Sequence, residues 1–191
     1  DINCTHLAGR HIFVYAGNMG TAQHMDKLLN LANSMQKRQD VGFLFVGRGS
    51  EVQRLRNRAI IENMTNVLFK DEIDPAEIPG LYAQCHVGMI CLDARHRTHN
   101  IPGKFLTYLQ SGLPVLASIN PDNDLQTLVE RRGVGRVSVD AGGSDLPMLA
   151  NLIIENELRD TELATRCQAM SEELFSTRAA VNQIVHALKL Q

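Results

Sequence analysis

The run His11-Ile12-Phe13-Val14-Tyr15-Ala16 leads directly into Gly17-Asn18-Met19-Gly20, a strand-like segment followed by a glycine turn. Its first six residues are mostly apolar and lack the strict alternation of a strand with one wet face, which is typical of a parallel strand covered on both sides. The two glycines after it allow a tight turn. We therefore predict a strand at His11–Ala16, a turn at residues 17–20 and a helix that opens at Thr21–His24.

The same pattern recurs along the chain. Five further apolar runs, short and rich in Val, Ile and Phe, predict strands at Val41–Val46, Asn66–Phe69, His86–Leu92, Leu113–Ile119 and Gly135–Val139. Apolar stripes with helical spacing lie between them, at Met25–Met35 and Val52–Ala59, and further helical stretches lie near Ser144–Glu155, Asp160–Glu173 and Thr177–Leu188. This β-α alternation predicts an α/β fold, a Rossmann-like doubly wound parallel sheet of about six strands with a helical C-terminal tail.

Two segments carry explicit signals for the start of a helix. Asp74-Pro75-Ala76-Glu77 combines an N-cap aspartate, a proline at the first helical position and a glutamate three residues after the cap. Pro102-Gly103 opens a second helix, and Gly112 ends it before the next apolar run.

Length, charge and cysteine usage exclude several classes of protein. At 191 residues with a net charge of -2, no Trp and 5% aromatic residues, the chain lacks the basic surplus and the stacking residues of a nucleic-acid-binding protein. No apolar run reaches the roughly 18–20 residues of a membrane helix. Cys85 and Cys91 lie in apolar segments and no CxxC pair occurs, so we expect reduced, buried thiols in a reducing cytoplasm.

The chain begins Asp1-Ile2-Asn3, without Met and without a signal peptide. We therefore expect a processed protein or a piece of a longer one. We predict that residues 1–9 are the remnant of a linker and that residues 10–191 form one domain.

Ligands of open α/β sheets bind at the carboxyl ends of the strands, so the loops after the strands hold the candidate residues. Gly17, Asn18 and Gly20 follow the first strand, where the turn and the next helix N-terminus would suit a phosphate. Arg48 follows the second strand between two glycines and could reach a diphosphate. A plain turn and a solvated arginine remain equally open interpretations of these two loops.

The loop after the fourth strand, Asp93–Asn100, is the most polar and basic in the chain. Its His and Arg side chains suit an anionic or sugar ligand, although a solvated loop is an open alternative. His96 and His99 lie three residues apart, but no Cys or carboxylate completes a set with metal-ligand spacing, so we predict no metal site. Lys104 lies in the first turn of the next helix, where it opposes the helix dipole, and a bound anion would offset that cost.

With these residues assembled, the chain resembles the C-terminal, nucleotide-sugar-binding half of a family-four glycosyltransferase with the GT-B fold. The likeness runs from Val14 to the last helix, and its most specific segment is Pro102-Gly103-Lys104-Phe105 with Tyr108 and Gly112-Leu113-Pro114-Val115. Ile101–Phe105 together with Ile119-Asn120 and Asn123-Asp124-Leu125 is similar to bacterial O-antigen or capsule transferases of N-acetyl-L-fucosamine, which use a uridine diphosphate (UDP) donor.

The resemblance implies a donor-binding domain at residues 10–191 that uses no cofactor and no metal. It implies a donor site at Gly17, Asn18, Gly20, Arg48, His99, Gly103, Lys104, Phe105 and Thr107. The family carries two glutamates, one for the donor sugar and one for the ribose, at positions that are His99 and Thr107 here. Arg48 and Lys104 are then the candidates for the diphosphate charge.

The resemblance further implies a retaining, hexosyltransferase-type enzyme. Its acceptor site and its catalytic residues would lie on a missing N-terminal domain, so this chain alone would be inactive. Its partners would be a UDP-sugar and a lipid-linked O-antigen or capsule acceptor, and its place the cytoplasm, as a peripheral protein on the inner face of the bacterial plasma membrane.

Two other classes share the predicted fold. A stand-alone flavodoxin-like nucleotide-binding or signalling module is the main alternative, although Gly17-Asn18 stands where a receiver domain needs an acidic cluster. A sugar-nucleotide epimerase would need catalytic carboxylates and a second half.

Overall fold

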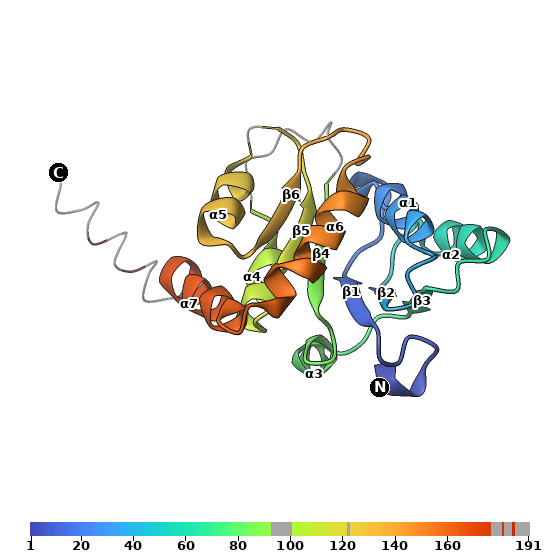
Figure 1. The fold of residues 1–191 in the computed structure, drawn as a ribbon, viewed down its shortest axis with the longest axis horizontal. Coiled ribbons are helices and arrows are strands. Elements are labelled where there is room, and N and C mark those ends of the chain that lie inside the picture. The colour runs from blue at the N-terminus through green and yellow to red at the C-terminus, as the bar shows by residue number, and fades with distance from the viewer. Residues whose placement is uncertain (93–100, 122, 177–180, 182–184, 186–191) are drawn as a thin grey trace.

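The chain forms an α/β domain around one parallel sheet (Figure 1). The computed structural model describes residues 1–92, 101–121, 123–176, 181 and 185. The strands are β1 (His11–Ala16), β2 (Val41–Val46), β3 (Val67–Lys70), β4 (Val87–Cys91), β5 (Val115–Ser118) and β6 (Gly135–Ser138). They pair in parallel in the order β3-β2-β1-β4-β5-β6. This is the predicted doubly wound arrangement, and all six predicted strands are confirmed with ends that differ by at most two residues.

Helices cover both faces of the sheet. The α-helices are α1 (Asp26–Ser34), α2 (Val52–Ile61), α3 (Ile78–Tyr82), α4 (Gly103–Gln110), α5 (Asp124–Arg132), α6 (Leu146–Glu155) and α7 (Leu163–Phe175). Short 3-10 helices lie at Ile2–Cys4, Thr21–Gln23, Pro75–Glu77 and Glu157–Arg159. Figure 1 shows α1 and α2 beside the β3 end of the sheet, with α5 and α7 at the β6 end.

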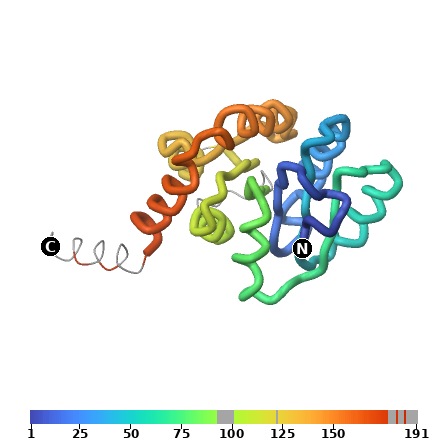
Figure 2. The backbone as a smooth tube through the Cα atoms, turned by 60° about the horizontal axis from the view of Figure 1, so that its bottom comes forward, coloured from blue at the N-terminus to red at the C-terminus, as the bar shows by residue number. Residues whose placement is uncertain are grey.

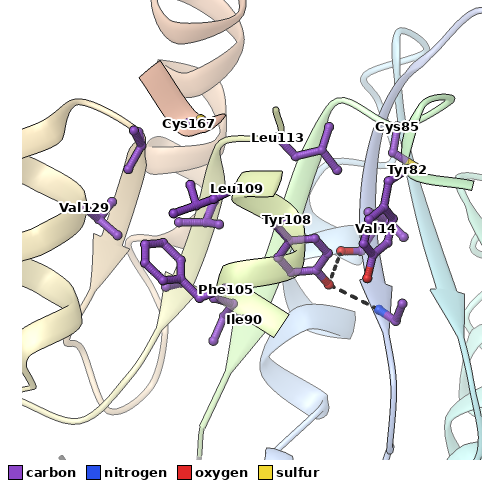
Figure 3. Packing of buried hydrophobic residues seen from close by; sticks show 14 of the residues in the cluster. Val14, Tyr82, Cys85, Ile90, Phe105, Tyr108, Leu109, Leu113, Val129 and Cys167 are labelled. Carbon is purple, nitrogen blue, oxygen red and sulfur yellow. Dashed lines mark hydrogen bonds between the residues drawn. The ribbon is translucent and has the colours of Figure 1, made fainter. Parts of the chain in front are cut away.

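Successive side chains of a strand point to opposite faces of the sheet, so each strand contributes to two hydrophobic cores, one on each face. Phe13 and Tyr15 of β1 join the core under α1, α2 and α6, whereas Ile12 and Val14 join the core under α3, α4, α5 and α7. In the second core the hydroxyl of Tyr108 bonds with the backbone of Val14, shown as a dashed line in Figure 3. The inner strands β1, β2, β4 and β5 are buried on both faces and mostly apolar, whereas the edge strands β3 and β6 contain Lys70 and Arg136.

The direction of chain winding reverses between β1 and β4. Strands β2 and β3 are added on one side of β1, and strands β4, β5 and β6 are added on its other side. Tyr108 of α4 packs on β4 so closely that a Cβ at Gly88 would lie 2.3 Å from its ring. Such a reversal leaves a crevice at the carboxyl ends of the strands, which is where ligands of this fold bind.

The predicted helix signals are confirmed, with one correction. Asp74 caps its helix, with its carboxylate accepting a hydrogen bond from the N–H of Ala76, and Pro102 begins α4. The helix predicted to open at Thr21–His24 is only a 3-10 turn, and α1 begins at Asp26. The reason is that His24 is in the left-handed conformation, with φ 45°, and this ends the turn. The helix predicted near Thr177–Leu188 lies almost wholly outside the described residues.

Residues Asp1–Gly9 pack against the domain. Figure 2 shows this dark blue segment across the amino end of the sheet, beside the green segment that contains α3. Ile2 and Leu7 are buried in the core, and the backbone N–H of Ile2 donates to the Gln84 side chain at 2.8 Å. The linker boundary at residue 9 stays a prediction.

Candidate functional site

Two glycine turns lie against each other at the carboxyl ends of β1 and β2. The register pairs Ala16 with Val46, so the turns at Gly17 and Gly47 leave the sheet side by side. Gly47 has φ +138°, and a Cβ on it would lie 2.0 Å from the carbonyl oxygen of Gly17. The N–H of Met19 also donates to the carbonyl of Arg48 at 2.7 Å. Glycine is therefore required here by the approach of the two backbones.

Lys104 reaches these turns from the first turn of α4. Its Nζ lies 3.3 Å from the Tyr15 hydroxyl and 4.6 Å from the centroid of the Tyr15 ring. A Cβ on Gly17 would lie 3.3 Å from the same Nζ, so the ammonium rests against the turn. Burial lowers the pKa of Lys104. Among the described residues no carboxylate lies within ion-pair distance of Lys104, and a partly desolvated cation of this kind favours an anionic ligand.

A cavity of about 240 Å³ opens beside Lys104, and we call it the carboxyl-edge cavity. One wall consists of strand ends and turns, a second of the loop after β3, and a third of α4. Its described lining residues are Ala16, Gly17, Val46, Gly47, Glu72, Ile73, Pro75, Ile78, Tyr82, Lys104 and Thr107. The cavity thus combines one cation, one carboxylate in Glu72, a glycine turn, a threonine hydroxyl and an apolar side.

Arg48 lies outside this cavity wall. Its side chain is 79% exposed and pairs with Glu72 at 3.4 Å, across the gap between the loops after β2 and β3. Glu72 itself lines the cavity. The structure therefore separates the two cations that the sequence put forward together, with Lys104 inside the cavity and Arg48 at its rim.

The other predicted site residues differ in where their side chains lie. Asn18 is exposed, and its side-chain amide donates to the Gln23 side chain at 3.3 Å; the backbone N–H of Gly20 donates to the same oxygen. Thr107 is exposed at the cavity, and its hydroxyl donates to the carbonyl of Lys104 at 3.0 Å. Phe105 is fully buried in the core, where its ring meets Phe175, so its side chain is no part of the cavity wall.

Gly103 is exposed, and a Cβ there would meet nothing within 4 Å. Packing within the chain therefore does not require a glycine at the start of α4. His99, together with His96 and the rest of the loop 93–100, lies outside the described residues.

Sequence reasoning missed Tyr15 and the segment between β3 and α3, where Glu72 and Ile73 of the loop, Pro75 of the 3-10 helix and Ile78 of α3 line the cavity. The loop could have been found, because it too follows a strand at the carboxyl edge. Tyr15 does not follow a strand but lies within one, and a tyrosine in an apolar run is typical of the hydrophobic core.

Larger cavities lie elsewhere and suit an anion less well. One of about 750 Å³ lies between α4 and α7, and the only charged side chain among its described lining residues is Glu172. Another, of about 520 Å³, lies beside α2 and β3, where Arg56 is paired with Asp71. Neither is at the carboxyl edge. A third cavity, of about 370 Å³, is lined by Lys70 but also by Asp1 and Glu77, so we regard the carboxyl-edge cavity as the functional candidate.

The described residues show neither a metal cluster nor a membrane-spanning helix. They contain no group of three His, Cys, Asp or Glu side chains placed to hold a metal ion. None of their helices has the length and apolar character needed to cross a membrane. The four cysteines, all among the described residues, form no disulfide, and Cys85 and Cys91 are buried as predicted.

Comparisons with solved structures find the same fold in other proteins. The structure is similar to Anabaena HepE in complex with UDP, with a TM-score of 0.77 and 19% identity, covering 97% of this chain and 50% of that one. It is also similar to S. aureus TarM in complex with Fondaparinux, alpha-GlcNAc-glycerol and UDP, with a TM-score of 0.75 and 15% identity, covering 93% of this chain and 35% of that one.

A curated relative is the probable glycosyltransferase WbjE of Pseudomonas aeruginosa, 22% identical over 134 residues, which cover 70% of this chain and 33% of WbjE. The chain thus spans about a third of that relative and half of HepE. The family model described as "Glycosyl transferases group 1" matches residues 10–155, which run from just before β1 to the end of α6. This match covers well over half of the sequence, and the chain belongs to the group 1 glycosyltransferase family.

Proposed function

We propose that the chain is the donor-binding half of a glycosyltransferase and that the carboxyl-edge cavity holds a UDP-sugar. The observation that carries the proposal is Lys104, a partly buried cation without a carboxylate partner among the described residues, which faces a glycine turn inside that cavity. The diphosphate would lie between Lys104 and Gly17, near the N-terminus of α4. The nucleoside would lie against the apolar side formed by Ile73, Pro75 and Ile78.

The comparisons support UDP as the nucleotide. HepE has been solved with UDP and with UDP-glucose, and TarM with UDP. In this chain the Thr107 hydroxyl, at the position where the resembled family carries a glutamate, would contact the ribose as a neutral partner. Gly17, Asn18, Gly20, Arg48, His99, Gly103 and Phe105 remain proposed donor-site positions, with Arg48 acting from the rim and Phe105 through its backbone.

The proposed role of this half in catalysis is electrostatic. As the bond from the sugar to UDP breaks, negative charge develops on the departing diphosphate, and a preorganised cation with helix N–H groups stabilises that charge. Lys104 is already held against the turn before any ligand binds. The proposed reaction retains the anomeric configuration of a hexosyl donor, with N-acetyl-L-fucosamine as the proposed sugar.

The size of the cavity supports a second domain. Small-molecule sites commonly measure about 300–1,000 Å³, so a cavity of about 240 Å³ is small for a complete nucleotide-sugar site. We propose that an N-terminal acceptor-binding domain closes over it and supplies the remaining catalytic residues. A lipid-linked O-antigen or capsule acceptor is proposed, with WbjE as a relative and WaaG, described as involved in lipopolysaccharide biosynthesis, as a similar structure. Such an acceptor would place the enzyme at the cytoplasmic face of the bacterial plasma membrane.

Calorimetric titration of the chain with UDP, uridine and flavin mononucleotide tests the proposal. UDP should bind, and uridine should bind at least tenfold more weakly because it lacks the phosphates that Lys104 contacts. Binding of the flavin but not of UDP would instead favour a flavodoxin-like module. Absence of UDP binding at millimolar concentration would refute the donor-site assignment.

A transfer assay tests the division into halves. The chain alone should bind UDP without transferring sugar from a UDP-sugar to a lipid-linked acceptor. Transfer by the purified chain would show that no second domain is needed.

A further inference from the structure

The Tyr15 hydroxyl joins two parts of the candidate site. It donates a hydrogen bond to the backbone carbonyl of Asn18 at 2.7 Å, which holds the turn after β1. The same oxygen accepts a hydrogen bond from Lys104 Nζ at 3.3 Å, which holds the cation of α4. Lys104 lies 89 residues from Tyr15 in the chain, and this one buried side chain bonds to both the turn and the lysine.

The direction of these two bonds is chemically determined. An ammonium can only donate, so the phenol oxygen must accept from Lys104 and direct its own proton to Asn18. Burial raises the pKa of Tyr15 far above its ordinary value, so the phenol stays neutral. A neutral acceptor orients the ammonium without cancelling its charge, whereas a carboxylate in this place would compete with a phosphate for the lysine.

We propose that Tyr15 is a positioning residue, whose hydroxyl holds Lys104 and the Gly17–Gly20 turn in the arrangement that binds the donor diphosphate. The inference rests on the proposed function. It extends that function to a residue outside the cavity wall, which acts on the nucleotide only through Lys104 and the turn.

The first test is Tyr15→Phe, which keeps the ring under Lys104 and its packing in the core but removes the hydroxyl. UDP affinity should fall about three- to tenfold, the range expected for one hydrogen bond, while uridine affinity stays within about twofold. Tyr108→Phe is the matched control, because the Tyr108 hydroxyl is also buried and bonds with the backbone of Val14, Ala16 and Met89. Tyr108→Phe should lower the melting temperature without selective loss of UDP. Equal losses of UDP and uridine affinity in Tyr15→Phe would overturn the inference.

The second test uses pH and a double substitution. The described titratable groups that face Lys104 are Tyr15 and the thiol of Cys91. Since the hydroxyl stabilises the charged ammonium, its removal should shift the alkaline loss of UDP affinity to lower pH, a change that a merely structural tyrosine would not cause. In a Lys104→Met background, Tyr15→Phe should weaken UDP by a smaller factor than in the wild-type chain, because only its bond to the turn remains to be lost.

The outcomes separate this inference from the proposed function. If the wild-type chain binds no UDP, the proposed donor-binding function and the positioning role of Tyr15 are both wrong. If Lys104→Met weakens UDP but Tyr15→Phe neither weakens UDP nor moves the pH profile, the donor site stands and the positioning role of Tyr15 is wrong. Full additivity of the two substitutions would also contradict it.

Discussion

Lys104 and Arg48 carry the same charge in different surroundings. Lys104 is partly buried in the cavity, whereas Arg48 is 79% exposed and already paired with Glu72. Exposed ion pairs contribute about 0–1 kcal/mol, whereas a hydrogen bond to a charged group contributes about 1.5–3 kcal/mol. The cation inside the cavity should therefore dominate the binding of the diphosphate.

We predict that Lys104→Met weakens UDP binding about ten- to hundredfold, and that Arg48→Met weakens it about threefold or less. Calorimetry with UDP and uridine measures both. Lys70→Met is the control, since Lys70 ends β3 and does not line the cavity. Lys104→Met should leave the melting temperature unchanged or higher, because burial disfavours the charged lysine. A larger effect of Arg48 than of Lys104 would reverse the assignment.

His86 makes stability depend on pH. Its Nδ1 accepts a hydrogen bond from the N–H of Ile12 at 3.0 Å, and its ring meets that of His11 edge-on at 5.2 Å. Burial, and secondarily the charge of His11, lower the pKa of His86 below its ordinary value of 6.5. The unfolded chain therefore binds the proton more readily than the folded chain.

The contribution of His86 to stability is thus complete above about pH 6.5 and is lost as the pH falls below it. Urea denaturation at a series of pH values should show a decreasing free energy of unfolding over that range. His86→Asn keeps an acceptor near the Nδ1 position and should flatten the dependence. An unchanged slope in His86→Asn would assign the effect to other groups.

The glycine turns after β1 and β2 form one unit at the scale of elements. A side chain at Gly47 would collide with the Gly17 carbonyl and would also need φ +138°, so two independent costs oppose any other residue there. We predict that Gly47→Ala destabilises the domain by more than about 2 kcal/mol.

Gly80→Ala is the matched control for Gly47→Ala. A Cβ at Gly80 meets nothing within 4 Å, and alanine in a helix should be neutral or stabilising by up to about 1 kcal/mol. Denaturant midpoints of the two variants give the comparison. Similar midpoints would show that the turns can separate without cost.

The N-terminal segment is tested by Leu7, which is fully buried and packs near Gly42 of β2. Leu7→Ala should cost about 2–4 kcal/mol of stability, as for other buried leucines. Asn3→Ala, at an exposed position of the same segment, should cost less than about 0.5 kcal/mol. If Leu7→Ala is as mild as Asn3→Ala, the segment is a loosely attached linker.

For the whole molecule, we predict that UDP binding is independent of divalent metal. The Lys104 ammonium is placed to neutralise the diphosphate in the cavity. UDP affinity measured with EDTA and with added Mg²⁺ should agree within about twofold. A loss of more than tenfold in EDTA would show that a cation is part of the site.

The sequence by itself determined the sheet, because the cause of each strand is local. Runs such as Val41–Val46 are apolar at every position, which is possible only between two helical layers, and the runs recur with helical stripes between them. The order of the strands was not predicted, because it depends on which strands pair once the sheet has assembled. The capping residue Asp74 and the start of α4 at Pro102-Gly103 were equally local signals. The left-handed conformation of His24, after which α1 begins, had no local signal in the sequence.

Only the tertiary structure decided which side chains meet. Lys104 and Arg48 both follow a glycine, and the local sequence does not distinguish them. In the structure Lys104 lies in the cavity beside Tyr15, whereas Arg48 points outward and pairs with Glu72. The sequence placed Leu7 in a predicted linker remnant, and only the structure shows that its side chain is buried near Gly42 of β2. The physical reason is that hydrophobic periodicity reports whether a residue is buried. The partner of a polar group depends on distances between segments far apart in sequence, which exist only once the sheet has assembled.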